Sequence, residues 1–484
     1  MNFQIIRRTL GWILIFEAIF LLVPTVTALV YREQEVLDFL TSMLICVAVG
    51  CLLLVGKLKN TAIYAREGFV IVALSWIVMS LFGALPFWLS GAIPSYIDAL
   101  FETVSGFTTT GATVLPSGAA IEALPKSILI WRSFTHWVGG MGVLVFILAF
   151  LPLSGGRNIN IMKAESPGPT VSKLVPKIRS TAGILYLLYA GLTLLIFIML
   201  AFDMPLFDAL TTAFSTAGTG GFAIKADGFA GYSTYAQVTV TVFMILFSIN
   251  FASFYFVLRG RVKEAFNTEV KVFLGIVVAA IALVTLNLCL TDSAAYEYTT
   301  GEAIKHSAFS VASVISTTGF ATANFDLWPA FSKTVLVLLM FIGACAGSTG
   351  GGFKVSRTVV LFKGVSHEMK RMLHPKQVKN ITMDNRVVEP EVVRSINSYL
   401  IAYLLIFIAS MFVISLDCQD LVTNFTSVSA TFNNIGPGLG AVGPEGNFAA
   451  FSTISKLTYI FDMLAGRLEI FPLLILFAPS TWRK

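Results

Sequence analysis

The sequence predicts an all-α polytopic membrane protein. Of the 484 residues, 56% are hydrophobic and 12% are charged, which is about half the charged share of a soluble domain. Apolar runs of about 20 residues, the length that crosses a hydrocarbon core, recur along the chain. A β-barrel would instead show short segments of alternating hydrophobicity.

Ten membrane spans are expected, with both termini in the cytoplasm. The spans cover residues 9–31, 36–56, 68–90, 127–152, 180–202, 235–258, 270–291, 333–362, 394–416 and 455–478. Basic residues gather in alternate connections, and the longest, 363–394, holds Lys363, Lys370, Arg371, Lys376, Lys379, Arg386 and Arg394. Cytoplasmic loops carry such an excess of Lys and Arg. The net charge of +6 therefore reports topology, and we expect no nucleic-acid partner.

The opposite connections are poor in basic residues and rich in carboxylates. They hold Asp98, Glu102, Asp203, Asp208, Asp227, Asp292, Glu302, Asp326, Asp417 and Asp420. These acids would surround the outer opening, or mouth, of a pathway and attract cations to it. The alternative is that they are ordinary solvated loop charges.

Four outer connections contain a further apolar stretch that is too short to span a membrane. Each has the length of a re-entrant half-helix and closes on glycine. The stretches are 95–107, 205–216, 302–316 and 420–432, and they lead into TTTG at 108–111, GTGG at 218–221, STTG at 316–319 and NNIG at 433–436. The unit of span, half-helix, glycine stretch and span thus occurs four times. The first two spans stand outside it.

The four glycine stretches are expected to line one pathway. Non-helical backbone at membrane depth is tolerated only where protein or water covers it, and four stretches that converge on a shared axis meet this condition. Their carbonyl oxygens would replace the hydration shell of an ion, and glycine permits the positive φ that turns these carbonyls the same way. The C-terminal end of each half-helix also favours a cation. The alternative is an ordinary helix break with packed threonines.

The sequence GACAGSTGGGFK at 343–354 interrupts the second span of the third unit. A phosphate-binding loop is excluded, because no Gly-Lys pair occurs and the flanks are membrane-like. Two interpretations remain. One is close helix packing through small residues. The other is a loop that lines and obstructs the pathway just inside the glycines, with Lys354 and Arg357 marking its return toward the cytoplasm.

Two charged residues lie within apolar spans. Arg467, near the middle of the last span, is costly unless it faces protein or water, and it therefore indicates a functional site. The alternative is an internal pair with Glu469 or Asp462. Glu17, in the first span, would contact a partner helix, snorkel to the interface or remain a neutral buried acid. At the outer end of the fourth span, Arg132 and His136 receive no role beyond packing or a dimer contact.

These features favour a channel-like transporter over two other classes. A secondary symporter also uses broken helices, but it usually shows two inverted repeats rather than four parallel ones. Coupling to protons or sodium stays open. An intramembrane enzyme would need HExxH, paired aspartates or a nucleophile with a base, and the sequence offers none. The five cysteines form no CxxC or Cys/His cluster, so no disulfide framework or zinc site is expected.

Short motifs spread over nearly the whole chain carry a family resemblance. They are AREGF at 65–69, GALPF at 83–87, TTTGAT at 108–113, GGMG at 139–142, GGF at 220–222, TTGF at 317–320, GACAGSTGGGFK at 343–354, NNIGPGLG at 433–440 and GRLEIF at 466–471. Together they resemble the Trk/Ktr/HKT superfamily of potassium transporters, in particular its TrkH branch. The resemblance implies potassium uptake across a bacterial cytoplasmic (inner) membrane.

The resemblance also implies a selectivity filter. Its residues would be Thr108, Thr109, Thr110, Gly111, Thr219, Gly220, Gly221, Thr317, Thr318, Gly319, Asn434, Ile435 and Gly436. In the wider family a serine in the first filter goes with sodium transport, so glycine in all four favours potassium. The second filter departs from the pattern by its extra glycine, which leaves its register open.

A gate and partners are implied as well. The gate residues would be Gly343, Ala344, Cys345, Ala346, Gly347, Ser348, Thr349, Gly350, Gly351, Gly352 and Arg467. The implied partners are a second copy of the chain and a cytoplasmic, TrkA-like tetrameric ring of nucleotide-binding regulatory subunits. Loop 363–394 is the expected docking surface for that ring. Potassium is the transported ion, and no cofactor is expected in this chain.

The implied architecture is four M1–P–M2 repeats of the potassium-channel type around one pore. Residues 1–60 form two extra N-terminal transmembrane helices. The repeats cover residues 61–155, 156–262, 263–363, which includes the gating loop, and 364–484.

Overall fold

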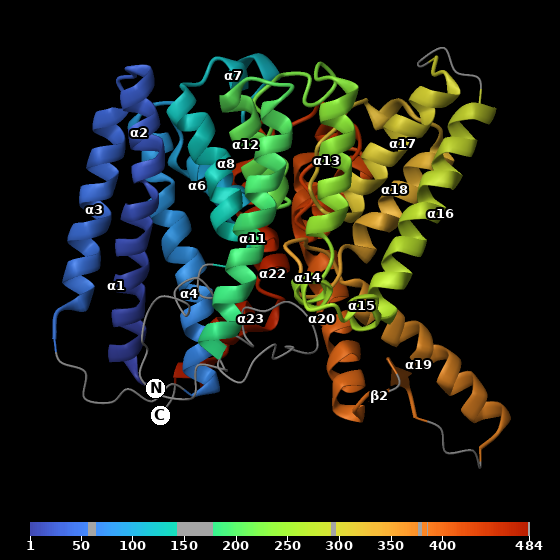
Figure 1. The fold of residues 1–484 in the computed structure, drawn as a ribbon. Coiled ribbons are helices and arrows are strands. Elements are labelled where there is room, and N and C mark those ends of the chain that lie inside the picture. The colour runs from blue at the N-terminus through green and yellow to red at the C-terminus, as the bar shows by residue number, and fades with distance from the viewer. Residues whose placement is uncertain (57–63, 143–177, 292–296, 376–379, 385, 483–484) are drawn as a thin grey trace.

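The computed structural model describes residues 1–56, 64–142, 178–291, 297–375, 380–384 and 386–482. It confirms an all-α polytopic membrane protein. Both termini lie at one end of the molecule (Figure 1), which we call the terminal face. Within these residues, six helices are long and apolar enough to cross a membrane, or seven if one bent pair counts as a single span. Asp292, Lys376, Lys379 and the inner end of the predicted span 127–152 lie outside the described residues.

The first helices form a layer at one side of the molecule (Figure 1). They are α1 (Phe3–Phe20), α2 (Leu22–Tyr31) and α3 (Val36–Leu54). Helices α1 and α3 cross closely at two glycines, since a Cβ added at Gly11 would lie 2.8 Å from Gly50 O. Small residues allow this approach in a membrane.

The remaining helices follow the order expected for four units. The first two units contain α4 (Ala65–Gly83), α5 (Leu85–Leu89), α6 (Tyr96–Phe107), α7 (Gly118–Glu122), α8 (Lys126–Gly140), α11 (Ile178–Ala201), α12 (Leu206–Ala217), α13 (Thr234–Phe247) and α14 (Phe251–Leu258). The last two contain α15 (Val262–Ala265), α16 (Thr268–Leu290), α17 (Thr300–Ile315), α18 (Ala330–Ile342), α19 (Val355–Leu373), α20 (Pro390–Ile414), α21 (Leu421–Phe432), α22 (Thr453–Arg467), α23 (Phe471–Phe477) and α24 (Pro479–Trp482).

Short elements complete the chain. The described residues include the 3₁₀ turns η1 (Phe325–Leu327), η2 (Ser415–Asp417) and η3 (Gly440–Val442). Between α19 and α20, strands β1 (Thr382–Met383) and β2 (Arg386–Val387) pair antiparallel, with Thr382 opposite Val387. Near the terminal face, α19 and this hairpin extend away from the bundle (Figure 1).

The four short stretches between spans are half-helices, as the sequence predicts. They are α6, α12, α17 and α21. Ser95, Thr299 and Asp420 accept hydrogen bonds from the first-turn N–H groups of α6, α17 and α21, whereas α12 begins after Pro205. Such caps satisfy N–H groups that have no partner inside a helix, which explains where these half-helices start.

The predicted span 235–258 is not one helix. Helices α13 and α14 are bent by 94° at a break over residues 248–250. Asn250 caps α14 by accepting the Ala252 N–H at 2.9 Å. The Phe251 N–H donates to Gly347 O at 3.0 Å, and Ser248 O accepts the Cys345 N–H at 3.0 Å. The segment 343–354 thus satisfies backbone groups that the bend leaves free.

The predicted span 455–478 is also broken, between α22 and α23. Glu469 and Ile470 there have φ values of 58° and 63°, and Pro472 in the first turn of α23 has no N–H to donate. In the third unit, segment 343–354 interrupts the span between α18 and α19, as predicted.

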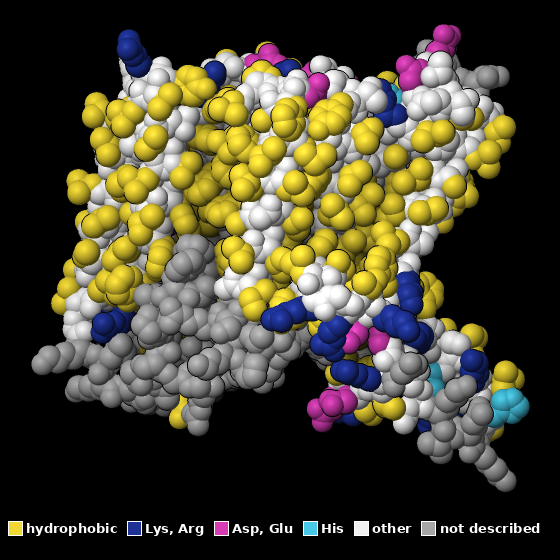
Figure 2. Space-filling model, in the orientation of Figure 1, with side chains coloured by type: hydrophobic (Ala, Val, Ile, Leu, Met, Phe, Trp, Pro, Cys, Tyr) yellow, Lys and Arg dark blue, Asp and Glu magenta, His cyan; other side chains and the backbone are white. Residues whose placement is uncertain are grey.

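The lateral surface is apolar, as a membrane-embedded chain requires. Figure 2 shows hydrophobic side chains over most of this surface and several Lys and Arg side chains near its lower margin, around α15 and α19. Arg259, Arg261 and Lys263 are exposed there. The described basic residues therefore gather toward the terminal face.

Candidate ion-conducting site

We call residues 108–111, 218–221, 316–319 and 433–436 the four filter segments, and each begins with the same backbone pattern. After α6, the Thr109 N–H donates to Gly106 O at 3.1 Å and the Thr110 N–H to Ser105 O at 2.8 Å. This pair of bonds is a Schellman motif, in which the residue beyond the helix takes a left-handed conformation. The residues at this place have φ values between 54° and 61° and are Thr109, Thr219, Thr317 and Asn434.

Each segment then returns to positive φ two residues later. These residues are Gly111, Gly221, Gly319 and Gly436, with φ values of 79° to 97°. Gly221 therefore takes the same place in the second segment that Gly111 takes in the first. Within the described residues, the carbonyl oxygens of 109–111, 219–221, 317–319 and 434–436 accept no hydrogen bond. Those oxygens are free to bind an ion.

The four glycines stand against one another in a closed ring. A Cβ added to any of them would meet a carbonyl oxygen of the next segment. The distances are 2.0 Å from Gly111 to Gly220 O, 1.8 Å from Gly221 to Thr318 O, 2.1 Å from Gly319 to Ile435 O and 2.7 Å from Gly436 to Thr110 O. The fourth segment thus meets the first. Each contact between neighbouring segments requires a residue without a side chain.

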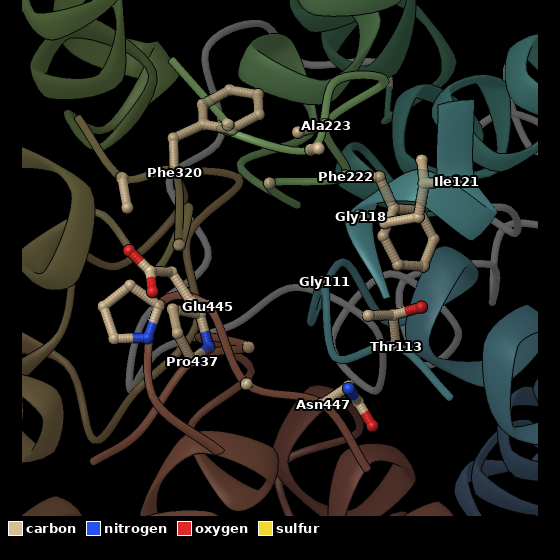
Figure 3. A pocket seen from close by; sticks show the side chains of 18 of the residues that line it. Gly111, Thr113, Gly118, Ile121, Phe222, Ala223, Phe320, Pro437, Glu445 and Asn447 are labelled. Atoms are coloured by element: carbon tan, nitrogen blue, oxygen red, sulfur yellow. The ribbon is translucent and has the colours of Figure 1, made fainter. Parts of the chain in front are cut away.

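A cavity of about 560 Å³ opens on one side of this ring, and all four glycines line it (Figure 3). Its ionisable lining comes from Arg132, Lys225, Asp227 and Glu445. Of these four residues, only Asp227 is among the acids that the sequence predicts at the outer mouth of the pathway. Glu102, another predicted mouth acid, is buried instead.

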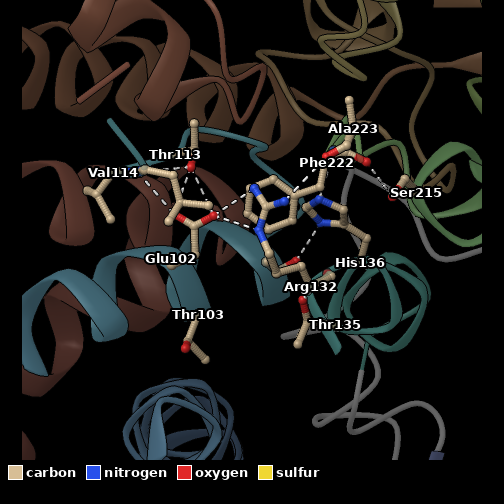
Figure 4. A network of polar contacts seen from close by, with 12 residues as sticks. Glu102, Thr103, Thr113, Val114, Arg132, Thr135, His136, Ser215, Phe222 and Ala223 are labelled. Atoms are coloured by element: carbon tan, nitrogen blue, oxygen red, sulfur yellow. Dashed lines mark hydrogen bonds and ion pairs between the residues drawn. The ribbon is translucent and has the colours of Figure 1, made fainter. Parts of the chain in front are cut away.

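Glu102 forms a buried ion pair with Arg132 (Figure 4), and the guanidinium nitrogen lies 2.8 Å from the carboxylate. Glu102 also accepts the Thr113 hydroxyl at 3.0 Å and the Val114 N–H at 3.0 Å. Arg132 lies over the Phe222 ring at 4.1 Å. One ion pair therefore braces the chain that leaves the first and the second filter segments. Sequence reasoning missed this role, although two oppositely charged residues beside apolar runs were a signal.

Segment 343–354, which we call the intramembrane loop, contacts the third and fourth filter segments. The Gly351 N–H donates to Thr317 Oγ1 at 2.6 Å, and the Gly352 N–H donates to Asn433 O at 3.1 Å. A Cβ on Gly351 would lie 2.4 Å from Asn433 O, so the loop packs directly on the filter backbone.

The other side of the loop is held by a buried carboxylate. Glu269, at the start of α16, accepts the Ala346 N–H at 2.7 Å and the Ser356 N–H at 3.1 Å. Lys354 is 3% exposed, and its ammonium donates to Gly350 O. Both ends of the loop are thus fixed by charged side chains.

Arg467 joins the loop to the first unit. Its Nη1 donates to Thr349 O at 2.8 Å, and its Nη2 donates to Gly140 O at 2.7 Å and Gly139 O at 2.5 Å. Glu469, one partner that the sequence suggested for Arg467, is bound by Arg357. Arg357 also lies 4.1 Å over the Tyr399 ring. The structure therefore brings Arg467 to a loop carbonyl, that of Thr349, and to the end of α8.

The sequence profile of the TrkH family, described as cation transport protein, matches residues 36–484. The chain belongs to the TrkH family. This TrkH family member is 37% identical over its whole length to the Trk system potassium uptake protein TrkH of Salmonella typhimurium, and the match covers all of both chains. It is 31% identical to the Trk system potassium uptake protein TrkG of Escherichia coli, over 99% of each.

A solved structure of the family has the same fold. The crystal structure of the potassium transporter TrkH from Vibrio parahaemolyticus superposes with a TM-score of 0.88 at 33% identity, and all of both chains are covered. The prediction that the chain is a transporter rather than an enzyme is confirmed by these relatives, which are named as transport proteins.

Proposed function

We propose that this chain takes up potassium ions through a pore whose selectivity filter is the ring of four filter segments. The observation that carries this proposal is the ring of Gly111, Gly221, Gly319 and Gly436. Each of these glycines lies against a backbone carbonyl of the next segment, and these carbonyls accept no hydrogen bond from the described residues. Carbonyl oxygens replace the water around a potassium ion. The relatives are named as potassium uptake proteins, which supports potassium as the ion.

The ion-binding residues are then those of the four segments. They are Thr108 to Gly111, Thr219 to Gly221, Thr317 to Gly319 and Asn434 to Gly436. Each segment belongs to one M1–P–M2 repeat, within residues 61–155, 156–262, 263–363 and 364–484, and residues 1–60 add two helices outside the repeats. The equal backbone conformations of the segments support this division.

Residues 343–352 of the intramembrane loop, together with Arg467, form the gate. It packs on the filter through Gly351 and Gly352 and is tied to the first unit through Arg467. Hydrogen bonds of this kind can break and form without unfolding the bundle. In this proposal, the loop obstructs the pathway when these bonds are formed and moves aside when they break.

Control of this gate belongs to partners. The terminal face carries the described basic loops, so it faces the cytoplasm of the inner membrane, and α19 connects the gate to that side directly. A TrkA-like ring of nucleotide-binding subunits acts from there on a homodimer of this chain. The segment at 363–394 is its docking surface.

Rubidium uptake into proteoliposomes tests the proposal. A potassium pore takes up rubidium, discriminates against sodium and keeps its rate when a protonophore collapses the proton gradient. Loss of uptake with that gradient would favour a second candidate, a proton-coupled symporter, and strict dependence on external sodium would favour a sodium-coupled one. Potassium transport would be refuted if rubidium uptake were absent with the proton gradient intact, after its collapse and in the presence of external sodium.

A further inference from the structure

The second filter segment lacks side chains where the first has them, and a histidine of the first unit occupies the space. Gly218 and Gly220 stand at the places of Thr108 and Thr110. A Cβ added at Gly220 would lie 2.2 Å from both Cγ and Nδ1 of His136. A side chain at position 220 and the imidazole therefore exclude each other.

Two hydrogen bonds fix the imidazole between the first and second segments. Nε2 of His136 accepts the Phe222 N–H at 3.2 Å. Nδ1 therefore carries the proton of the neutral ring, and it donates to Gly106 O at 2.8 Å. Gly106 lies in the half-helix before the first filter segment, and Phe222 directly follows Gly221. His136 thus joins the two segments.

The imidazole is enclosed by protein. His136 is 0% exposed, and its ring centroid lies 4.3 Å from that of Phe222. Figure 4 shows it beside Phe222, one turn of α8 from the ion pair of Arg132 with Glu102. Removing a ring from such a packed site leaves a void that its neighbours fill only in part.

We propose that His136 is a positioning residue for ion selectivity, acting as the side chain that the second filter segment lacks. Its ring packs against Gly220, and its Nε2 binds the Phe222 N–H. These contacts on both sides of Gly221 fix the distance between Gly221 and the neighbouring carbonyls. The proposal rests on the proposed function, because it concerns the selectivity of the same filter. Loss of the ring allows the second segment to recede, which favours ions of other sizes.

The first experiment compares rubidium and sodium uptake by purified full-length variants in proteoliposomes. His136→Ala is expected to lower the rubidium-to-sodium uptake ratio by about tenfold, since two buried hydrogen bonds and the packing behind Gly220 are lost. His136→Gln, which retains a donor and an acceptor, keeps more of this ratio. An unchanged ratio in His136→Ala would overturn the proposal.

The second experiment tests the steric complementarity. Gly220→Ala is expected to lower rubidium uptake at least about tenfold because its methyl group meets the imidazole, and His136→Ala in the same chain restores uptake. Gly218→Ala is the matched control, because its Cβ would lie 2.2 Å from the backbone oxygen of His136. His136→Ala cannot relieve that contact. No rescue of Gly220→Ala, or an equal rescue of Gly218→Ala, would contradict the assignment.

Gel filtration in detergent confirms that each variant is folded. If His136→Ala is not monodisperse, His136→Asn replaces it, because its shorter amide cannot reach both partners. Equal ratios in His136→Asn and His136→Gln would then overturn the proposal. A wild-type chain without rubidium uptake would refute the proposed function itself, whereas uptake without the rescue refutes only the role of His136.

Discussion

Removing the Arg467 side chain is expected to raise potassium flux, because its guanidinium holds the intramembrane loop through the Thr349 carbonyl. Two further acceptors, Gly139 and Gly140, belong to α8 rather than to the loop. One charge-assisted hydrogen bond to the loop is therefore lost in Arg467→Ala, worth about 1.5–3 kcal/mol. The ratio of closed to open loops then falls by a factor of about 10 to 150.

Initial rates of rubidium uptake into proteoliposomes, without a regulatory subunit and normalised to incorporated protein, measure this effect. Arg467→Lys separates the contribution of the positive charge from that of the hydrogen bonds. Lysine keeps the charge but lacks the guanidinium fork that reaches both the loop and α8. Arg371→Ala is the control, since that arginine is exposed and pairs with Glu368 at 3.6 Å on the surface of α19. A rate in Arg467→Ala equal to or below wild type would refute the holding role.

Three further outcomes are expected. Gly319→Ala abolishes rubidium uptake while gel filtration stays normal, because its Cβ would lie 2.1 Å from a carbonyl oxygen of the fourth filter segment; Gly183→Ala, where nothing lies within 4 Å, keeps wild-type uptake. Glu102→Gln leaves a buried guanidinium unpaired and lowers the free energy of unfolding by about 3–5 kcal/mol, seen in thermal denaturation. Hydrogen bonds from Thr423 hold the pKa of Asp420 below its usual 3.8, so its cap stabilises α21 above that pH. Asp420→Ala therefore lowers the melting temperature at neutral pH, and the difference from wild type disappears as the pH falls below the folded-state pKa.

Patterns along the chain were sufficient for the half-helices. Their length, their distance from the spans and their closing glycines are local features, and α6, α12, α17 and α21 lie within one or two residues of the predicted stretches. Hydrophobic length also predicts the long spans α11, α16 and α20 correctly, because lipid imposes that length on any helix.

The breaks near residues 248–250 and 468–470 escaped prediction for a physical reason. Both lie within runs that are apolar on average. At the first break, backbone groups are bound by partners distant in the chain, such as Gly347. At the second break, Glu469 takes a left-handed conformation that its residue type does not favour. Its N–H donates locally to Gly466 O, whereas its side chain pairs with the distant Arg357. Contacts between distant segments therefore accompany both breaks.

The partners of Arg132 and His136 could not be predicted from the sequence either. A buried polar residue on an apolar helix indicates that some partner exists, but not which one. The glycine-rich second segment and His136 explain each other only when they are seen side by side, since each alone suggests a defect in packing.

The closed ring of glycines also has a genetic consequence. In a channel assembled from four identical subunits, one substitution changes four positions around the pore at once. Here one continuous chain supplies all four quarters, so a substitution alters a single quarter and its effect can be balanced by one neighbour. The unequal segments TTTG, GTGG, STTG and NNIG can therefore differ from one another, and the proposed role of His136 is one such local compensation. The glycine that closes each quarter lacks that freedom, because the ring leaves no space for any alternative.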